Sequence, residues 1–255
     1  MATLKRYASK VITLPNGHSP INSLKIIHLI IPVHSPESGW NSILQTRFDE
    51  FAGSLDSDSE VEPLMIVDGP VSGQVKNEIE AFASNGWKVL WLAENIGKGE
   101  ALRRGAQSIK GHFMLFTDVD MPYSTSRMKT IVHSLLAGSD LAFGRRDSKY
   151  LQALPFQRRL ISILLKAFNK YILRLKHPDT QCGLKGFSAK GKQCLIATKT
   201  KSFSFDIELA VIASKQKDFN WTAVDVELRK GVIFRDMNFA ILKHELRNLW
   251  RIIKK

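Results

Sequence analysis

The sequence predicts an α/β fold with a mostly parallel central sheet and helices on both of its faces. Short runs of aliphatic and β-branched residues recur through the first 150 residues, as in buried strands. Stretches with apolar residues at helical spacing separate these runs. Because strands that alternate with helices are joined by right-handed crossovers, the helices are expected to cover both faces. The chain has 255 residues, 44% of them hydrophobic, which is enough for such a core.

The predicted strands of the first half are residues 26–33, 63–68, 88–93, 112–118 and 140–144. Between the third and fourth, Leu102, Ala106 and Ile109 lie at helical spacing. A second helical repeat, residues 128–136, runs up to Gly138, which is a typical helix stop. These elements predict one continuous sheet rather than separate small domains.

The regular alternation of predicted strands and helices ends after residue 150. The predicted elements there are a long amphipathic helix at 155–176, a loop at 177–186, a strand at 219–228 and a last helix from about 238. Residues 1–23 mix Pro, Gly, Asn and Ser with short apolar pieces, so we expect an N-terminal extension of undetermined structure. Residues 24–255 are expected to form a single domain, with halves at 24–150 and 151–255.

The chain is strongly basic. Lys and Arg total 37 against 24 acidic residues, a formal charge of +13, which predicts an anionic partner such as a nucleotide, a nucleic acid or a lipid headgroup. A nucleic-acid-binding protein is the alternative from another class, but no recognised nucleic-acid motif supports it. Two cysteines without metal-ligand spacing, and no signal-peptide pattern, predict a cytoplasmic location. No apolar run reaches the roughly 20 residues of a spanning helix.

Two carboxylates follow the fourth predicted strand. Asp118 and Asp120 lie where the run HFMLFT ends, and α/β sheets bind ligands outside the carboxyl ends of their strands. Such neighbouring carboxylates repel each other unless a cation compensates them, and Mg²⁺ or Mn²⁺ binds oxygen ligands together with substrate phosphates. The pair predicts a metal-diphosphate site. The alternative is an ordinary turn, in which this short pattern is also common.

A glycine-rich loop precedes these carboxylates. Asn95 to Gly99 runs from a predicted strand into a helix that carries Arg103 and Arg104. Glycines allow a backbone to approach an anion, and a helix N-terminus attracts one. The spacing is that of neither a P-loop nor a dinucleotide fingerprint, so a plain tight turn stays open.

Taken in order, several stretches resemble family 2 glycosyltransferases of the GT-A fold. They are IIPVHSPE, MIVD, NIGKGEALRRG, FMLFTDVD, LAFGRRD, DTQCGLKGFSA and FSFDIEL, within residues 26 to 210. The resemblance is strongest to the dolichyl-phosphate glucose and dolichyl-phosphate mannose synthases. It implies inverting, metal-dependent transfer of a hexose from UDP-glucose or GDP-mannose to a polyprenyl or dolichyl phosphate. A family 2 enzyme that acts on a hydroxyl of a glycan or small molecule is the alternative.

The resemblance also implies roles for individual residues of the first half. The nucleotide-sugar site would comprise Pro32, Val33, Glu37, Asp68, Lys98 and Asp118. Asp118 and Asp120 would hold Mg²⁺ or Mn²⁺, with Asp120 among the catalytic residues. Asp68 matches the first acidic residue of the family's usual turn. The sequence Val67-Asp68-Gly69-Pro70 departs from the family pattern because it lacks the second one.

In the second half, the resemblance assigns the acceptor side of the reaction. Arg145, Arg146 and Asp179 would be catalytic, and Arg158, Gln181 and Lys185 would bind the acceptor. An acceptor phosphate ionises near neutral pH and needs no strong base. For a hydroxyl acceptor, Asp179 is the first candidate base, with Asp206 or Glu208 behind it.

Two segments are both basic and amphipathic. Residues 156–175 gather an apolar stripe edged by Arg159, Lys166 and Lys170, and residues 239–253 form a similar one. Such helices either lie on a membrane surface or pack their stripe against the sheet. A lipid-linked acceptor favours the first interpretation and predicts a peripheral membrane partner.

Overall fold

The computed structural model describes residues 24–146 and 148–229. Its strands are Lys25–Val33 (β1), Ser59–Asp68 (β2), Lys88–Leu92 (β3), Phe113–Phe116 (β4), Leu141–Arg146 (β5), Lys185–Phe187 (β6) and Trp221–Val226 (β7). Its helices are Trp40–Ser54 (α1), Gly73–Ser84 (α2), Lys98–Ser108 (α3), Thr125–Leu136 (α4), Ser148–Ala153 (α5), Phe156–Tyr171 (α6), Ala189–Ile196 (α7) and Phe205–Ser214 (α8). The predicted extension at 1–23 and the last predicted helix lie outside the described residues.

The strands form one seven-stranded sheet in the order β3-β2-β1-β4-β6-β5-β7. All pairs are parallel except those of β6, which runs antiparallel between β4 and β5. The predicted mostly parallel α/β fold is therefore confirmed. The sequence placed β6 inside a loop because a strand of three residues, Lys-Gly-Phe, carries no alternating pattern.

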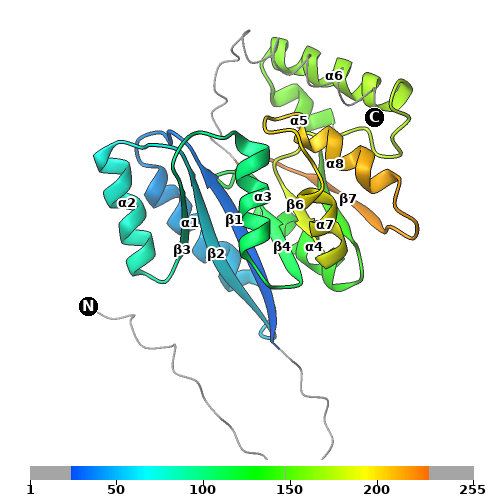
Figure 1. Cartoon of the computed structure of the whole chain (residues 1–255). Coiled ribbons are helices and arrows are strands. Elements are labelled where there is room, and N and C mark those ends of the chain that lie inside the picture. Colours follow the sequence, from blue (N-terminus) through cyan, green and yellow to red (C-terminus); the bar gives the residue numbers. More distant parts are fainter. Residues whose placement is uncertain (1–23, 147, 230–255) are drawn as a thin grey trace, which may run out of the picture.

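Helices cover both faces of the sheet, as expected (Figure 1). On one face α1, α2 and α4 contribute buried residues such as Phe51, Phe82 and Ile131 to a core with the sheet. On the other face α3, α7 and α8 contribute Leu102, Leu195 and Phe205. Buried aliphatic residues of β1 alternate between these two cores, which explains why its sequence reads as one apolar run.

The carboxyl ends of β1, β2, β4 and β5 reach one edge of the sheet, because these strands are linked through parallel pairs and through the antiparallel β6. Asp68 ends β2, the pair Asp118 and Asp120 follows β4, and Arg145 and Arg146 end β5. Helices α5 and α6 lie at this same end of the molecule (Figure 1). The fold thus gathers acidic and basic side chains from distant segments.

Helix α6 has its polar side turned to the protein. Ser162 and Asn169 are buried, and the Asn169 side-chain amide donates to the Pro178 carbonyl at 2.8 Å. The apolar side is exposed, with Phe156 69%, Leu164 60% and Tyr171 68% accessible. The alternative that this stripe packs on the sheet is therefore wrong. No helix within 24–146 or 148–229 is both long and apolar enough to span a bilayer.

Candidate active site

Strand register places Asp118 against a glycine. Phe116 of β4 pairs with Lys185 of β6, so Asp118, two residues further on, lies beside Gly183. A side chain at Gly183 would collide with the Asp118 carboxylate. The Tyr123 hydroxyl accepts a hydrogen bond from the Gly183 amide at 2.9 Å and fixes this approach. The glycine therefore leaves room for the first carboxylate of the predicted metal site.

Lys98, the first residue of α3, contacts the same carboxylate. Its Nζ lies 2.5 Å from Asp118 Oδ1. The ammonium also lies 5.0 Å from the centroid of the Phe116 ring and 5.7 Å from that of Phe203. The predicted nucleotide-site residues Lys98 and Asp118 are thus brought together, as a direct ion pair.

Asp120 lies at the second position of the pair, in a tight turn. The Met121 amide donates to the Asp118 carbonyl at 2.8 Å, and Arg47 of α1 donates to the carbonyls of Asp120 and Met121. Burial and the neighbouring Asp118 charge raise the pKa of Asp120 above its ordinary value. The turn therefore holds a carboxylate whose negative charge is poorly compensated.

The donor set fits a hard divalent cation completed by a substrate. Asp118 and Asp120 offer carboxylate oxygens, the ligand type that Mg²⁺ and Mn²⁺ prefer. Across the described segments no group of three or more His, Cys, Asp or Glu side chains is placed to hold a metal. Two carboxylates leave coordination positions for diphosphate oxygens, so a cation here would depend on the nucleotide.

Asp68 holds the loop before α3. Its carboxylate accepts from the Ile96 amide at 2.8 Å and from the Gly97 amide at 3.1 Å, and the residue is 4% exposed. The Asp68 carbonyl in turn lies 2.8 Å from Nδ1 of His34. Asp68 is therefore a structural anchor in this fold, and its predicted contact with the nucleotide stays a prediction.

The first amides of α3 have acceptors within the protein. Gly99 donates to the Lys201 carbonyl at 2.7 Å, and the Glu100 amide reaches the same oxygen at 3.4 Å. A Cβ on Gly97 or Gly99 would collide with this carbonyl or its neighbour. The glycines are thus explained by the close approach of residues 200–201 rather than by an anion cradle.

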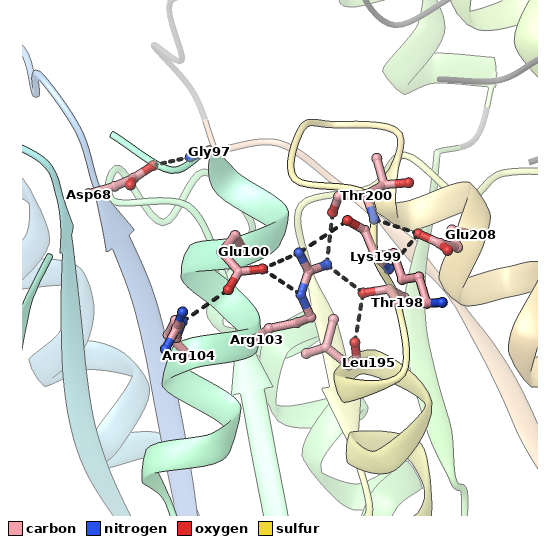
Figure 2. A network of polar contacts seen from close by, with 10 residues as sticks. All are labelled: Asp68, Gly97, Glu100, Arg103, Arg104, Leu195, Thr198, Lys199, Thr200 and Glu208. Carbon is pink, nitrogen blue, oxygen red and sulfur yellow. Dashed lines mark hydrogen bonds and ion pairs between the residues drawn. The ribbon is translucent and has the colours of Figure 1, made fainter. Parts of the chain in front are cut away.

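A buried arginine secures that approach. Arg103 of α3 donates to the Thr198 hydroxyl and the Thr200 carbonyl, each at 2.8 Å, and binds Glu100 (Figure 2). Glu208 of α8 accepts from the amides of Lys199 and Thr200 at 2.9 and 2.7 Å (Figure 2). Glu100 and Glu208 both hold the loop, which argues against Glu208 as the candidate base.

On the acceptor side, Asp179 is enclosed by cations. Arg146 Nη2 and Lys166 Nζ lie 2.6 and 2.9 Å from its carboxylate, and the Arg146 amide also donates to it at 2.7 Å. These cations lower the pKa of Asp179 although burial opposes them. A carboxylate held in this way is a poor proton acceptor, so the structure argues against Asp179 as a general base.

Lys185 lies beneath the surface. Its side chain is 3% exposed and its Nζ is 2.8 Å from Asp206, while a hydrogen bond joins it to the Cys182 carbonyl. Burial raises the pKa of Asp206, which shares this ion pair. The pair lines a small cavity with His177 and Trp221, and the assignment of Lys185 to acceptor binding stays a prediction.

The other predicted residues divide by exposure. Arg145 is exposed and pairs with Asp225 at 2.6 Å, whereas Val33 is fully buried in the core, where its side chain cannot contact a ligand. Pro32, Arg158 and Gln181 are half-buried and Glu37 is exposed. The roles assigned to these four residues stay predictions.

Sequence reasoning missed Arg47, Tyr123, Lys166 and Gly183. Arg47 and Lys166 lie on helices, where single basic residues carry no functional signal. The partner of Arg47 is also far away in the chain. The spacing of Gly183 from Lys185 became meaningful only through the antiparallel β6. Only the Cys-Gly pair in the motif DTQCGLKG hinted at a close approach there.

Comparison with known proteins places this geometry in a family. The profile of glycosyl transferase family 2 matches residues 30–193, which include the strand-end carboxylates and Gly183. The chain belongs to glycosyl transferase family 2. It is therefore a glycosyltransferase, and the resemblance seen in the sequence is confirmed.

Curated relatives within this family cover most of the chain. The dolichyl-phosphate β-glucosyltransferase of Dictyostelium discoideum is 25% identical over 84% of this chain and 71% of its own length. Its human counterpart is 25% identical over 94% of this chain and 81% of its own. Both names denote glucosyl transfer to a lipid phosphate in those proteins.

Solved structures share the fold. Glucosyl-3-phosphoglycerate synthase from Mycobacterium tuberculosis, in complex with Mn²⁺, UDP and phosphoglyceric acid, has a TM-score of 0.61. It is 18% identical, over 90% of this chain and 77% of that one. Mannosyl-3-phosphoglycerate synthase from Rubrobacter xylanophilus has a TM-score of 0.63 at 13% identity, over 90% and 73% of the two chains. These structural neighbours confirm the GT-A fold.

Proposed function

We propose that this glycosyltransferase transfers glucose from UDP-glucose to a polyprenyl phosphate, with inversion at the anomeric carbon and with Mg²⁺ or Mn²⁺. In this reaction an acceptor phosphate oxygen forms a bond to the anomeric carbon, and the bond from that carbon to UDP breaks. Support for the acceptor class comes from the dolichyl-phosphate β-glucosyltransferases that match most of the chain. GDP-mannose is the alternative donor.

The observation that carries the proposal is that three carboxylates of the site are already paired with other groups of the protein. Asp179 is paired with Arg146 and Lys166, Asp206 is buried against Lys185, and Glu208 holds backbone amides. A sugar hydroxyl would need such a group to accept its proton. A phosphate acceptor is already ionised near neutral pH, so it tolerates a site in which these carboxylates are occupied.

The remaining side chains suit a reaction in which both the acceptor and the leaving group carry phosphate. Asp118 and Asp120 would hold the divalent cation, which supplies charge stabilisation for the departing diphosphate. Arg145 and Arg146, at the end of β5, place guanidinium groups at the same edge of the sheet. Asp179 fixes the orientation of Arg146, so that its remaining N–H groups keep a defined direction.

A transfer assay with paired acceptors tests this proposal. UDP-glucose and GDP-mannose are each supplied with Mn²⁺ or Mg²⁺ and with either a short-chain polyprenyl phosphate or the matching polyprenol. We expect glucose transfer to the phosphate and none to the alcohol, and loss of transfer in EDTA. Transfer to the alcohol would favour the hydroxyl-acceptor alternative, and transfer from GDP-mannose alone would overturn the donor assignment.

We also propose that α6 docks the enzyme on the cytoplasmic face of a membrane with anionic lipids. Its outward side exposes Phe156, Leu160, Ile163 and Leu164, which lie at helical spacing. The cations Arg159 and Lys170 are on the same helix, and a chain of charge +13 is repelled by a second copy but attracted to anionic headgroups. The exposed apolar side and the basic charge together favour an anionic lipid surface as the partner.

The position of α6 supports the same partner. Lys166 ties the helix to the site by donating to the Arg146 carbonyl at 2.8 Å and pairing with Asp179. A lipid surface on the outer side of α6 would therefore lie next to the arginines proposed to meet the acceptor phosphate. The other basic stripe, residues 239–253, lies outside the described residues.

Vesicle binding tests the docking surface with a matched pair of variants. Leu164→Glu changes the exposed side of α6, and Ile43→Glu changes an exposed apolar residue of α1, 41% accessible. We expect Leu164→Glu to weaken binding to vesicles with phosphatidylserine about tenfold or more, and Ile43→Glu to leave it unchanged. Equal effects of both variants, or a change of oligomeric size caused by Leu164→Glu alone, would contradict lipid docking.

A further inference from the structure

Lys98 and a divalent cation need the same carboxylate. The Lys98 ammonium lies 2.5 Å from Asp118 Oδ1, and Asp118 is the first carboxylate of the proposed metal pair. Its other oxygen, Oδ2, faces Gly183, with no space for a further side chain. A cation that binds Asp118 therefore meets a positive charge already at one of its two oxygens.

The Lys98 ammonium is held by one ion pair and two cation–π contacts, whereas the backbone around Lys98 is fixed by hydrogen bonds. The side chain is 20% exposed, and the ammonium lies over the rings of Phe116 and Phe203. The backbone on either side is pinned, because the Gly97 amide donates to Asp68 and the Gly99 amide donates to the Lys201 carbonyl. The four-carbon stem can thus move the charge without moving the start of α3.

We propose that Lys98 is an internal counter-ion of the Asp118 carboxylate, which a divalent cation must displace and which the donor diphosphate then receives. This inference rests on the proposed cation at Asp118 and Asp120. Its consequence is a coupling between the two ligands. The cation alone competes with Lys98, whereas a bound diphosphate offers Lys98 a new anionic partner and so removes the competition.

The charge count of the site supports this order of events. Asp118 and Asp120 bring two negative charges, and Lys98 neutralises one of them. When a divalent cation takes both carboxylates, Lys98 loses its direct ion pair and keeps only the longer-range attraction of Asp206, which is itself paired with Lys185, so a diphosphate supplies a new direct partner. By linkage, nucleotide and cation then strengthen each other's binding equally.

Mn²⁺ binding to the full-length protein, followed by the loss of the free-Mn²⁺ electron paramagnetic resonance signal, tests the proposal without measuring activity. The variant is Lys98→Met, which keeps an apolar stem over the two rings. Lys98→Arg keeps the charge, and Lys201→Gln removes an exposed neighbouring charge as a control. Each protein is titrated with Mn²⁺ alone and with saturating UDP.

We expect Lys98→Met to bind Mn²⁺ alone about tenfold more tightly than the wild type. The increase in Mn²⁺ affinity when UDP is added should be smaller for Lys98→Met than for the wild type. Lys98→Arg and Lys201→Gln should resemble the wild type in Mn²⁺ alone. Unchanged or weaker binding of Mn²⁺ alone by Lys98→Met would overturn the counter-ion role. Should Lys98→Met fail to fold, as judged by its melting curve, Lys98→Gln is measured in its place under the same two criteria.

These outcomes separate the inference from the proposed function. If the wild type binds Mn²⁺ with UDP, and Asp118→Ala does not, the metal site stands whatever Lys98→Met shows. If the wild type binds no Mn²⁺ even with UDP, the metal requirement of the proposed function fails first, and the role of Lys98 fails with it.

Discussion

The guanidinium of Arg146 lies 2.6 Å from the carboxylate of Asp179, and both side chains are almost completely buried. This contact joins the end of β5 to the segment before β6. It also changes the role expected for Asp179, from a base that accepts a proton to a group that orients an arginine. Lys166 of α6 completes the cluster, so the proposed acceptor side of the site depends on three segments of the chain.

Replacement of Asp179 gives a prediction about stability and pH. The pKa of Asp179 is lowered in the folded protein, so its stabilising contribution is present at neutral pH and is lost as the pH falls through that lowered pKa. Asp179→Asn should reduce the free energy of unfolding by about 3 kcal/mol at pH 7. The difference from the wild type should begin to shrink near pH ~4, the ordinary aspartate range. Urea unfolding of both proteins between pH 7 and pH 3 measures it, and a difference independent of pH would contradict it.

Replacement of Asp120 should lower activity without lowering stability. Asp120→Asn removes a carboxylate whose pKa is raised by burial and by Asp118, so the melting temperature should be unchanged or higher. Turnover should fall by about two to three orders of magnitude, because a charge proposed to hold the cation is lost. Asp49→Asn, at an exposed position of α1, is the matched control. Normal turnover in Asp120→Asn would remove the residue from the metal site.

Gly183 should be required for the site but not for the fold. A methyl group at this position meets the Asp118 carboxylate, so Gly183→Ala should displace that group and weaken binding of Mn²⁺ with UDP at least tenfold. Gly53→Ala adds the same methyl group where nothing lies within 4 Å, and should leave binding intact. Titration calorimetry on both variants measures the effect, and equal affinities would show that Asp118 has another position available.

Two adjacent arginines should differ in their contribution to stability. The side chain of Arg103 is 6% exposed and holds the loop at 198–200, whereas that of Arg104 is 58% exposed and only reaches Glu100 (Figure 2). We expect Arg103→Met to cost about 3 kcal/mol because it leaves buried partners unpaired, and Arg104→Met at most about 0.5 kcal/mol. Chemical denaturation of the two variants provides the comparison. Similar losses would mean that the loop is held mainly by other contacts.

The sequence predicted those parts of the site that depend on local pattern. A buried apolar run that ends in acidic residues marked Asp118 and Asp120, and the order of strands and helices indicated which edge of the sheet they occupy. The glycines around Lys98 were interpreted as a backbone approach to an anion or as a tight turn, whereas in the structure they meet the backbone of residues 200–201. Their partner, the Lys201 carbonyl, belongs to a segment about a hundred residues away and has no signal in the loop itself.

Burial and orientation were the properties that the sequence did not determine. Lys185 was predicted to bind the acceptor, and nothing near it in the sequence shows that Asp206 pairs with it in the interior. The stripe on α6 was recognised by its period, but periodicity does not say which side of a helix faces the protein. Ser162 and Asn169 settled the direction, since their polar groups are the buried ones.

The identity of the transferred product tests the central claim most directly. The protein is incubated with ¹³C-labelled UDP-glucose, Mn²⁺ and a short-chain polyprenyl phosphate, and the lipid product is examined by mass spectrometry and NMR. We predict a β-glucosyl phosphate, with the labelled anomeric carbon coupled to phosphorus. A product in which glucose is joined to a hydroxyl, or an α-linked sugar phosphate, would contradict the assignment.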